Sequence, residues 1–157
     1  IIVDFSPDGN SITEKIPELV KKIKEGYDMV IASRYCDNAK SYDDTKLTAL
    51  GNFIFTKMIN MLFSKKYTDA LVIFRAYRMD FINECLLPGP LDNAITSLLC
   101  CRAARYNKRV ADIPADEPKR IHGYPKMNIV VDGFRNLKLI IAEFINPSTT
   151  ILIFGFP

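Results

Sequence analysis

Residues 1–10 read IIVDFSPDGN and decide the expected fold. The apolar residues around Asp4 are typical of a buried strand in a parallel sheet, and Pro7 and Gly9 require a turn at its carboxyl end. Ligands of open α/β sheets bind at this end of the strands. Asp8 is therefore placed either to hold a hard cation, which prefers oxygen ligands, or to close an Asx-turn.

Composition and charge narrow the classes of protein to which the chain can belong. Its 157 residues are 48% hydrophobic and 25% charged, which predicts one folded domain and excludes a disordered chain. The net charge of +3 comes without a cluster of Lys and Arg between aromatics, so we expect no nucleic acid partner. Four cysteines without CxxC spacing and a single histidine argue against a zinc site and for reduced thiols in a cytosolic protein.

The spacing of apolar residues after the first turn predicts a strand–helix–strand unit. The helix covers residues 17–26, with a proline in its first turn, and the second strand covers residues 28–32. A right-handed crossover makes the two strands of such a unit parallel. Arg34 follows the second strand at the same sheet edge as Asp8. It either faces a metal–phosphate site there or is an ordinary surface arginine.

The rest of the chain continues the alternation of helices, strands and loops. We expect polar loops at residues 36–46, 86–92 and 116–126, helices at 47–63, 95–106 and 127–144, and strands at 70–77 and 109–113. A strand at the very start has no earlier strand to pair with, because a parallel neighbour needs a long crossover before it. We therefore expect the chain to be the back half of a larger domain.

The apolar helix at residues 47–63 has two interpretations. Asn52, Lys57 and Asn60 interrupt it, so we expect it not to span a bilayer. Core packing is the ordinary explanation, and contact of one face with a membrane or a partner is the alternative.

The loop at residues 116–126 reads DEPKRIHGYPK and gathers positive charge. Lys119, Arg120 and Lys126 surround Gly123. A glycine among cations can wrap an anionic group, whereas solvation at the surface explains the same composition equally well.

Five short segments of the chain occur in the same order in one known family. They are IPELV at residues 16–20, EGYDMVI at 25–31 with Ser33-Arg34-Tyr35, Thr68-Asp69 with FRAYR at 74–78, CRAAR at 101–105, and Ile113-Pro114 with Glu117-Pro118, Arg120, Gly123 and Lys126. Together they resemble the second half of a family 2 inverting glycosyltransferase of the GT-A fold, close to the dolichyl-phosphate mannosyltransferase and polyprenyl-phosphate sugar transferase group. The match at residues 16–20 puts Ser6-Pro7-Asp8 on the Asp-x-Asp metal motif of that family.

The resemblance covers about residues 1–144 and leaves residues 145–157 as an apolar tail. It implies an α/β fold, the acceptor-side half of a Rossmann-like GT-A domain. The expected sheet is mostly parallel and flanked by helices, and the nucleotide-binding strands that come first in the family are absent.

The activity that the resemblance implies is sugar transfer with inversion. The donor would be a UDP- or GDP-linked sugar, the acceptor a polyprenyl phosphate or a saccharide, and the cofactor Mg or Mn. Such an enzyme would act in the cytoplasm, at the inner face of the membrane, in the synthesis of a cell-envelope glycan.

The resemblance also implies roles for individual residues. Asp8 would hold the metal, and Asp69 would be the general base for an acceptor hydroxyl. A lipid phosphate acceptor, whose oxygen is already ionised, needs no base. Phosphate groups would be held by four cations, namely Arg34, Arg75, Arg120 and Lys126.

Three departures from the family pattern and the abrupt start of the sequence favour two other interpretations. Ser6 replaces the first acid of the metal motif, Val72-Ile73 replaces a Ser-Gly pair, and Thr96 replaces an acidic residue. These changes favour a binding module without catalytic activity. The abrupt start favours a fragment that is inactive without its upstream half.

Overall fold

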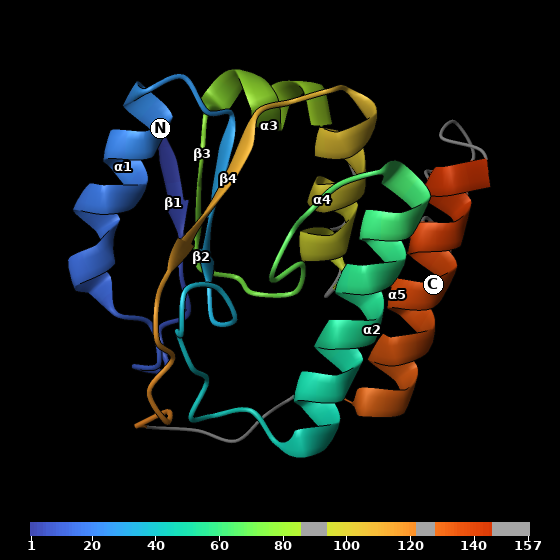
Figure 1. The fold of residues 1–157 in the computed structure, drawn as a ribbon, viewed down its shortest axis with the longest axis horizontal. Helices are drawn as coiled ribbons and strands as arrows, with labels where there is room; N and C mark the ends of the chain where they lie inside the picture. The colour runs from blue at the N-terminus through green and yellow to red at the C-terminus, as the bar shows by residue number, and fades with distance from the viewer. Residues whose placement is uncertain (86–93, 122–127, 146–157) are drawn as a thin grey trace.

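A four-stranded sheet in the order β1-β3-β2-β4 runs through the middle of the protein (Figure 1). The structure is a computed structural model that describes residues 1–85, 94–121 and 128–145. Its strands are β1 (Ile2–Asp4), β2 (Met29–Ser33), β3 (Arg75–Tyr77) and β4 (Val110–Pro114). Among the strands that the structure describes, only β2 and β4 pair in parallel, whereas β3 is antiparallel to both β1 and β2. The predicted α/β class is confirmed, but the described sheet is mixed rather than mostly parallel.

Helices cover both faces of this sheet. They are α1 (Ile16–Lys24), α2 (Lys46–Phe63), α3 (Met79–Cys85), α4 (Ile95–Arg105) and α5 (Ile129–Ile145), with a short 3-10 turn η1 (Thr13–Lys15) before α1. Figure 1 shows α1 on one side of the sheet and α2, α4 and α5 on the other. Helix α5 packs on α2 and α4.

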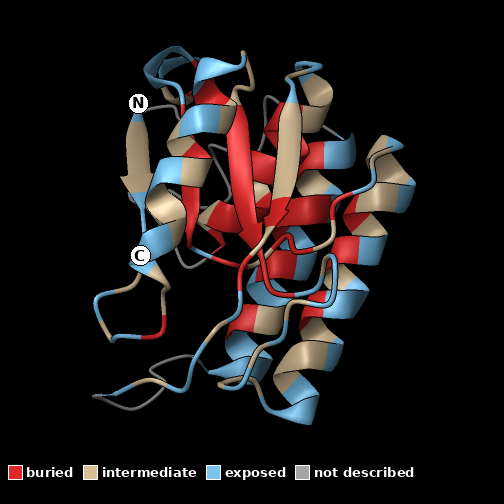
Figure 2. Cartoon of the chain, turned by 60° about the vertical axis from the view of Figure 1, so that its left-hand side comes forward, coloured by how far each residue is buried: buried red, intermediate tan, exposed pale blue. Residues whose placement is uncertain are grey.

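Strand β1 differs from its prediction in burial and in pairing. It is an edge strand that pairs antiparallel with β3. Ile2 and Val3 are only partly buried and Asp4 is exposed, and the tan arrow below the N mark in Figure 2 shows this strand. The prediction of a buried strand in a parallel sheet, without a partner in this chain, is therefore wrong. Strand β3 lies between β1 and β2 and is antiparallel to both, so β1 and β2 still run in the same direction, as the strand–helix–strand unit predicts.

The core centres on β2, which is buried along its whole length (Figure 2). Met29, Val30 and Ile31 have no exposed surface. Leu19 and Ile23 of α1 cover one face of the sheet, and the other face is covered by residues of α2 and α4. A continuous apolar run flanked by turns thus predicted the central strand correctly.

The remaining predicted elements are present with shifted ends. Strand β3 covers only the last three residues of the strand predicted at residues 70–77, because the residues before it turn around the carboxylate of Asp69. Helix α3 was not predicted. The loop predicted at residues 86–92, Gly123, Lys126 and the tail after Ile145 lie outside the described residues.

Helix α2 begins and ends with recognisable caps. The side chain of Thr45 accepts a hydrogen bond from the backbone N–H of Thr48 at 3.2 Å, and Ser64 ends the helix in a left-handed conformation with φ 53°. The N-cap fixes the entry of the chain directly after Asp43 and Asp44. Within the described ranges, no helix combines the length and the apolar character needed to cross a bilayer.

Candidate functional site

A cleft of about 320 Å³ opens where β1, β2 and β4 end. Asp8 comes from the turn after β1, Arg34 directly follows β2, and Glu117 lies just beyond β4. Asp43 and Asp44 line the same cleft from the loop before α2. The structure therefore brings Asp8 and Arg34 to one edge of the sheet, as the sequence predicted.

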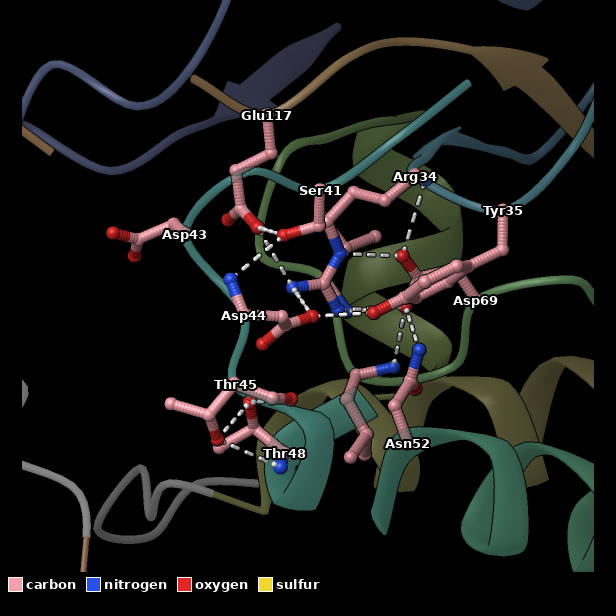
Figure 3. A network of polar contacts seen from close by, with 12 residues as sticks. Arg34, Tyr35, Ser41, Asp43, Asp44, Thr45, Thr48, Asn52, Asp69 and Glu117 are labelled. Carbon is pink, nitrogen blue, oxygen red and sulfur yellow. Dashed lines mark hydrogen bonds and ion pairs between the residues drawn. The ribbon is translucent and has the colours of Figure 1, made fainter. Parts of the chain in front are cut away.

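Arg34 lies at the centre of a network of three carboxylates (Figure 3). Its Nε donates to Asp69 Oδ2 at 2.7 Å and its Nη2 to Asp69 Oδ1 at 3.1 Å. Its Nη1 donates to Asp44 Oδ2 and to Glu117 Oε2, each at 3.1 Å. Burial opposes the charge of Arg34, but the three carboxylates outweigh it and raise its pKa above the usual value. Arg34 is therefore a buried, permanently charged residue.

Asp69 is fully buried and accepts hydrogen bonds from several directions. Besides the guanidinium, the backbone N–H of Arg34 donates to it at 3.2 Å and Nδ2 of Asn52 at 2.9 Å. The backbone N–H groups of Leu71 and Val72 donate to its Oδ1 at 3.3 and 3.1 Å. These contacts occupy both oxygens, so the arrangement does not support the predicted role of Asp69 as a general base. It supports a positioning role, in which Asp69 orients Arg34.

Glu117 connects the cleft to the loop before α2. Ser41 Oγ donates to its Oε2 at 2.5 Å, and Asn10 Nδ2 donates to its Oε1 at 3.2 Å. Burial raises the pKa of Glu117, even though Arg34 and the Ser41 hydroxyl favour its charged form. Tyr35 completes the group through a hydrogen bond from its hydroxyl to Asp44.

Arg120 joins the two acids at the other side of the cleft. Its Nε lies 3.0 Å from Asp43 Oδ2, and its Nη1 lies 3.5 Å from Asp8 Oδ2. The hydrogen bond from Arg120 lowers the pKa of Asp43. Asp8 keeps its second oxygen, Oδ1, buried and without a hydrogen-bond partner. The segments at residues 6–8 and 116–121, which are far apart in the sequence, thus meet at one place.

The cleft fits a divalent cation only in part. In the ranges that the structure describes, no group of three or more His, Cys, Asp or Glu side chains could hold a metal ion. The unpartnered Oδ1 of Asp8 is nevertheless a suitable oxygen ligand. Mg²⁺ commonly keeps several waters and takes only one or two carboxylates together with substrate phosphates.

Arg75 and the cysteines lie away from the cleft. Arg75 is fully buried and donates to the backbone oxygens of Val72 and Ala70, each at 2.7 Å, and of Thr96 at 3.1 Å. The structure therefore does not support the predicted phosphate contact, and Arg75 ties the segment before β3 to α4. The four cysteines are free thiols, as predicted, and burial raises the pKa of Cys100 although Arg75 opposes the shift.

Sequence reasoning missed several residues of this network. Asp43 and Asp44 fall in a stretch that was predicted only to be a polar loop. An acidic pair directly before a helix-capping threonine is the signal that could have found them. Asn52 was interpreted as an interruption of an apolar helix, although a lone amide on such a helix commonly has a buried partner.

Comparisons with known proteins do not place the chain in a family. No protein-family model matches it, and the search of curated proteins found no significant match. The interpretation of the cleft therefore rests on its own geometry and chemistry and on the resemblance of the short sequence segments.

Proposed function

We propose that the chain is part of a glycosyltransferase that moves a sugar, with inversion, from a UDP- or GDP-linked donor to an acceptor. The observation that carries this proposal is the meeting of Asp8 and Arg120 at the carboxyl end of the sheet, 3.5 Å apart. These residues belong to two separate segments that resemble the same family. Their contact supports a diphosphate site to which both segments contribute.

In the proposed reaction, the leaving group is a nucleoside diphosphate. Asp8 would hold Mg or Mn through its free oxygen, and the cation when bound would neutralise charge on the diphosphate. Arg120 would donate to a phosphate oxygen, with part of its present contact to Asp43 exchanged for the ligand. Arg34 is bound by Asp69, Asp44 and Glu117, so its charge is compensated within the network and its proposed role is to order the wall of the cleft.

The burial of Asp69 bears on the choice of acceptor. A saccharide hydroxyl needs a general base within hydrogen-bond reach, and Asp69 has no exposed oxygen to serve. A polyprenyl phosphate carries an oxygen that is already ionised. The geometry of Asp69 therefore favours a lipid phosphate as the acceptor over a saccharide.

The second candidate is a binding module with the same fold and no catalytic activity. Ser6 stands where the family has an acid, and it lines the cleft beside Asp8. Arg34 is occupied by three carboxylates rather than open to a ligand. A fragment that needs its upstream half for activity is the third interpretation.

Calorimetric titration with UDP and GDP, with and without manganese, tests the proposal. It would use the chain, the chain extended upstream, and the Asp8→Asn variant of each. We expect metal-dependent binding by the extended chain and its loss in Asp8→Asn, because the substitution removes the charged oxygen ligand. Asp37→Asn, in a polar loop outside the cleft lining, is the matched control and should bind normally. Unchanged metal dependence in Asp8→Asn would contradict the role of Asp8, and binding by neither form would favour the inactive module.

A further inference from the structure

Helix α2 turns its apolar side to the outside. The residues that it buries include Asn52 and Thr56, together with Ile59. Its exposed positions recur every three or four residues and form a single stripe of large apolar side chains: Leu47, Leu50, Phe53, Ile54 and Met61. A helix on the surface of a water-soluble domain usually shows the opposite arrangement.

Helix α5 repeats this inversion beside α2. Three of its five buried residues, Asp132, Asn136 and Glu143, are polar, and the other two are Leu139 and Ile140. Its exposed positions carry a second apolar stripe: Val130, Phe134, Leu137, Ile141 and Phe144. The rings of Phe63 and Phe144 contact each other edge to face, with centroids 5.8 Å apart, so the two helices are direct neighbours (Figure 1). We call the two stripes together the α2–α5 face.

The charges on the two helices have one sign where they are exposed. The acidic residues of α2 and α5, both of which the structure describes completely, are Asp132 and Glu143, and both are buried. Glu143 pairs with Arg102 at 3.0 Å and also with Arg105 of α4. Lys46, Lys57 and Lys138 are exposed.

From this arrangement we propose that the α2–α5 face docks on the surface of an anionic lipid bilayer. Large apolar side chains can enter the boundary between headgroups and acyl chains, while lysines beside them reach anionic headgroups. A second copy of the chain would bring like charges together. A protein partner would ordinarily form about one hydrogen bond per 100–200 Å² of interface, and the apolar stripes offer almost no polar side chains for this purpose.

The docking surface adjoins the candidate cleft. Thr45 and Thr48, at the start of α2, line the cleft, and Leu47 lies in the exposed stripe. A bilayer on the α2–α5 face would therefore lie next to the cleft entrance. The inference does not depend on sugar transfer, because binding to vesicles requires neither nucleotide nor metal.

Flotation with vesicles of phosphatidylcholine, with and without phosphatidylserine, tests the proposal on the full chain. We expect binding to the mixed vesicles that weakens as salt is added. Phe53→Asn combined with Phe134→Asn should weaken it about tenfold or more, because 59% and 69% exposed rings lose their insertion. Lys57→Gln and Lys138→Gln should each weaken it about fivefold on the anionic vesicles.

A matched pair of methionines controls for unspecific effects. Met61, 77% exposed, lies in the α2–α5 face, whereas Met79, 51% exposed, begins α3 outside it. Met61→Asn should weaken binding and Met79→Asn should leave it unchanged. All variants keep residues 146–157, so differences between them report the face alone. Equal binding by the whole set would overturn the proposal, and so would a dimer in sedimentation velocity that Phe134→Asn dissolves.

Discussion

Helix α1 buries Leu19 and Ile23 against the sheet and turns lysines and glutamates outward, whereas α2 buries Asn52 and Thr56 and turns leucine and phenylalanine outward. Both helices flank the same sheet (Figure 1). Helix α1 is held on the sheet by the burial of its apolar side chains. The arrangement of helix α2 requires a hydrogen-bond partner inside the protein for each of its buried polar groups.

The hydrogen bonds of the polar side chains of α2 explain why this helix buries them. Asn52 donates to Asp69, Thr56 Oγ1 donates to Asn52 Oδ1 at 3.2 Å, and the backbone N–H of Ala70 donates to Thr56 Oγ1 at 3.0 Å. Asn60 binds the backbone N–H and the backbone oxygen of Tyr67, both at 2.8 Å. Helix α2 thus holds the segment that carries Asp69, and through Asp69 it positions Arg34. The buried polar side chains of α2 therefore position residues of the candidate site.

Of the substitutions proposed for these helices and the cleft, Asp69→Ala should lower the free energy of unfolding the most. The variant leaves the buried guanidinium of Arg34 without its closest carboxylate, and removal of one partner from a buried ion pair typically lowers the free energy of unfolding by about 3–5 kcal/mol. Urea denaturation measures the loss. Asp37→Asn is the control, because Asp37 is exposed and its backbone has φ 44°, a conformation that asparagine tolerates. A loss below about 1 kcal/mol would mean that the network adds little to the fold.

Truncation of a side chain should lower the free energy of unfolding on the buried side of α2 and leave it almost unchanged on the exposed side. Asn52→Ala leaves buried polar groups unpaired and should lower the free energy of unfolding by about 1–3 kcal/mol. Phe53→Ala, at the neighbouring exposed position, should change it by less than about 0.5 kcal/mol. Thermal or urea unfolding of the two variants measures both. A larger loss for Phe53→Ala would show that the exposed stripe is covered within the protein itself.

The smallest effect concerns the pH dependence of stability and distinguishes two of the acidic residues that line the cleft, Glu117 and Asp43. Burial raises the pKa of Glu117 above its usual 4.5, so its contribution to stability is full at low pH and decreases as the pH rises through the folded-state value. Arg120 lowers the pKa of Asp43 below its usual 3.8, so the contribution of Asp43 is full above that value and is lost as the pH falls.

Unfolding measured across pH in Glu117→Gln and Asp43→Asn tests these directions. As the pH rises from about 3 to 7, Glu117→Gln should gain stability relative to the parent chain and Asp43→Asn should lose it. NMR titration of the two carboxyl groups in the parent chain provides the direct control. The same direction of change in both variants would contradict the assigned causes.

Local patterns in the sequence predicted much of the fold, and contacts between distant segments account for the rest. The apolar run that became β2 and the helical spacing of α1, α4 and α5 are local signals. The insertion of β3 between β1 and β2 is a pairing of distant segments, which no local pattern encodes. The residues of the candidate site also differ in whether a local sequence pattern predicts them. The positions directly after strands indicated Asp8 and Arg34. The basic loop indicated Arg120.

The partners of these residues could not be read from the sequence. Asp69 and Arg75 were expected to face a ligand because they occur in a segment that resembles a known motif. The structure instead buries both side chains completely. A motif match gives a residue type and a position along the chain, whereas exposure depends on helices α2 and α4, which pack over that segment.

The most direct test of the account is the effect of Mn²⁺ on amide NMR signals of the upstream-extended chain in the presence of UDP or GDP. Paramagnetic broadening is expected around Asp8 and Arg120, only with nucleotide present, and not in Asp8→Asn. Residues of α5 should remain sharp and serve as an internal control. Broadening elsewhere in the molecule, or broadening that survives Asp8→Asn, would contradict a nucleotide diphosphate site at the end of β1.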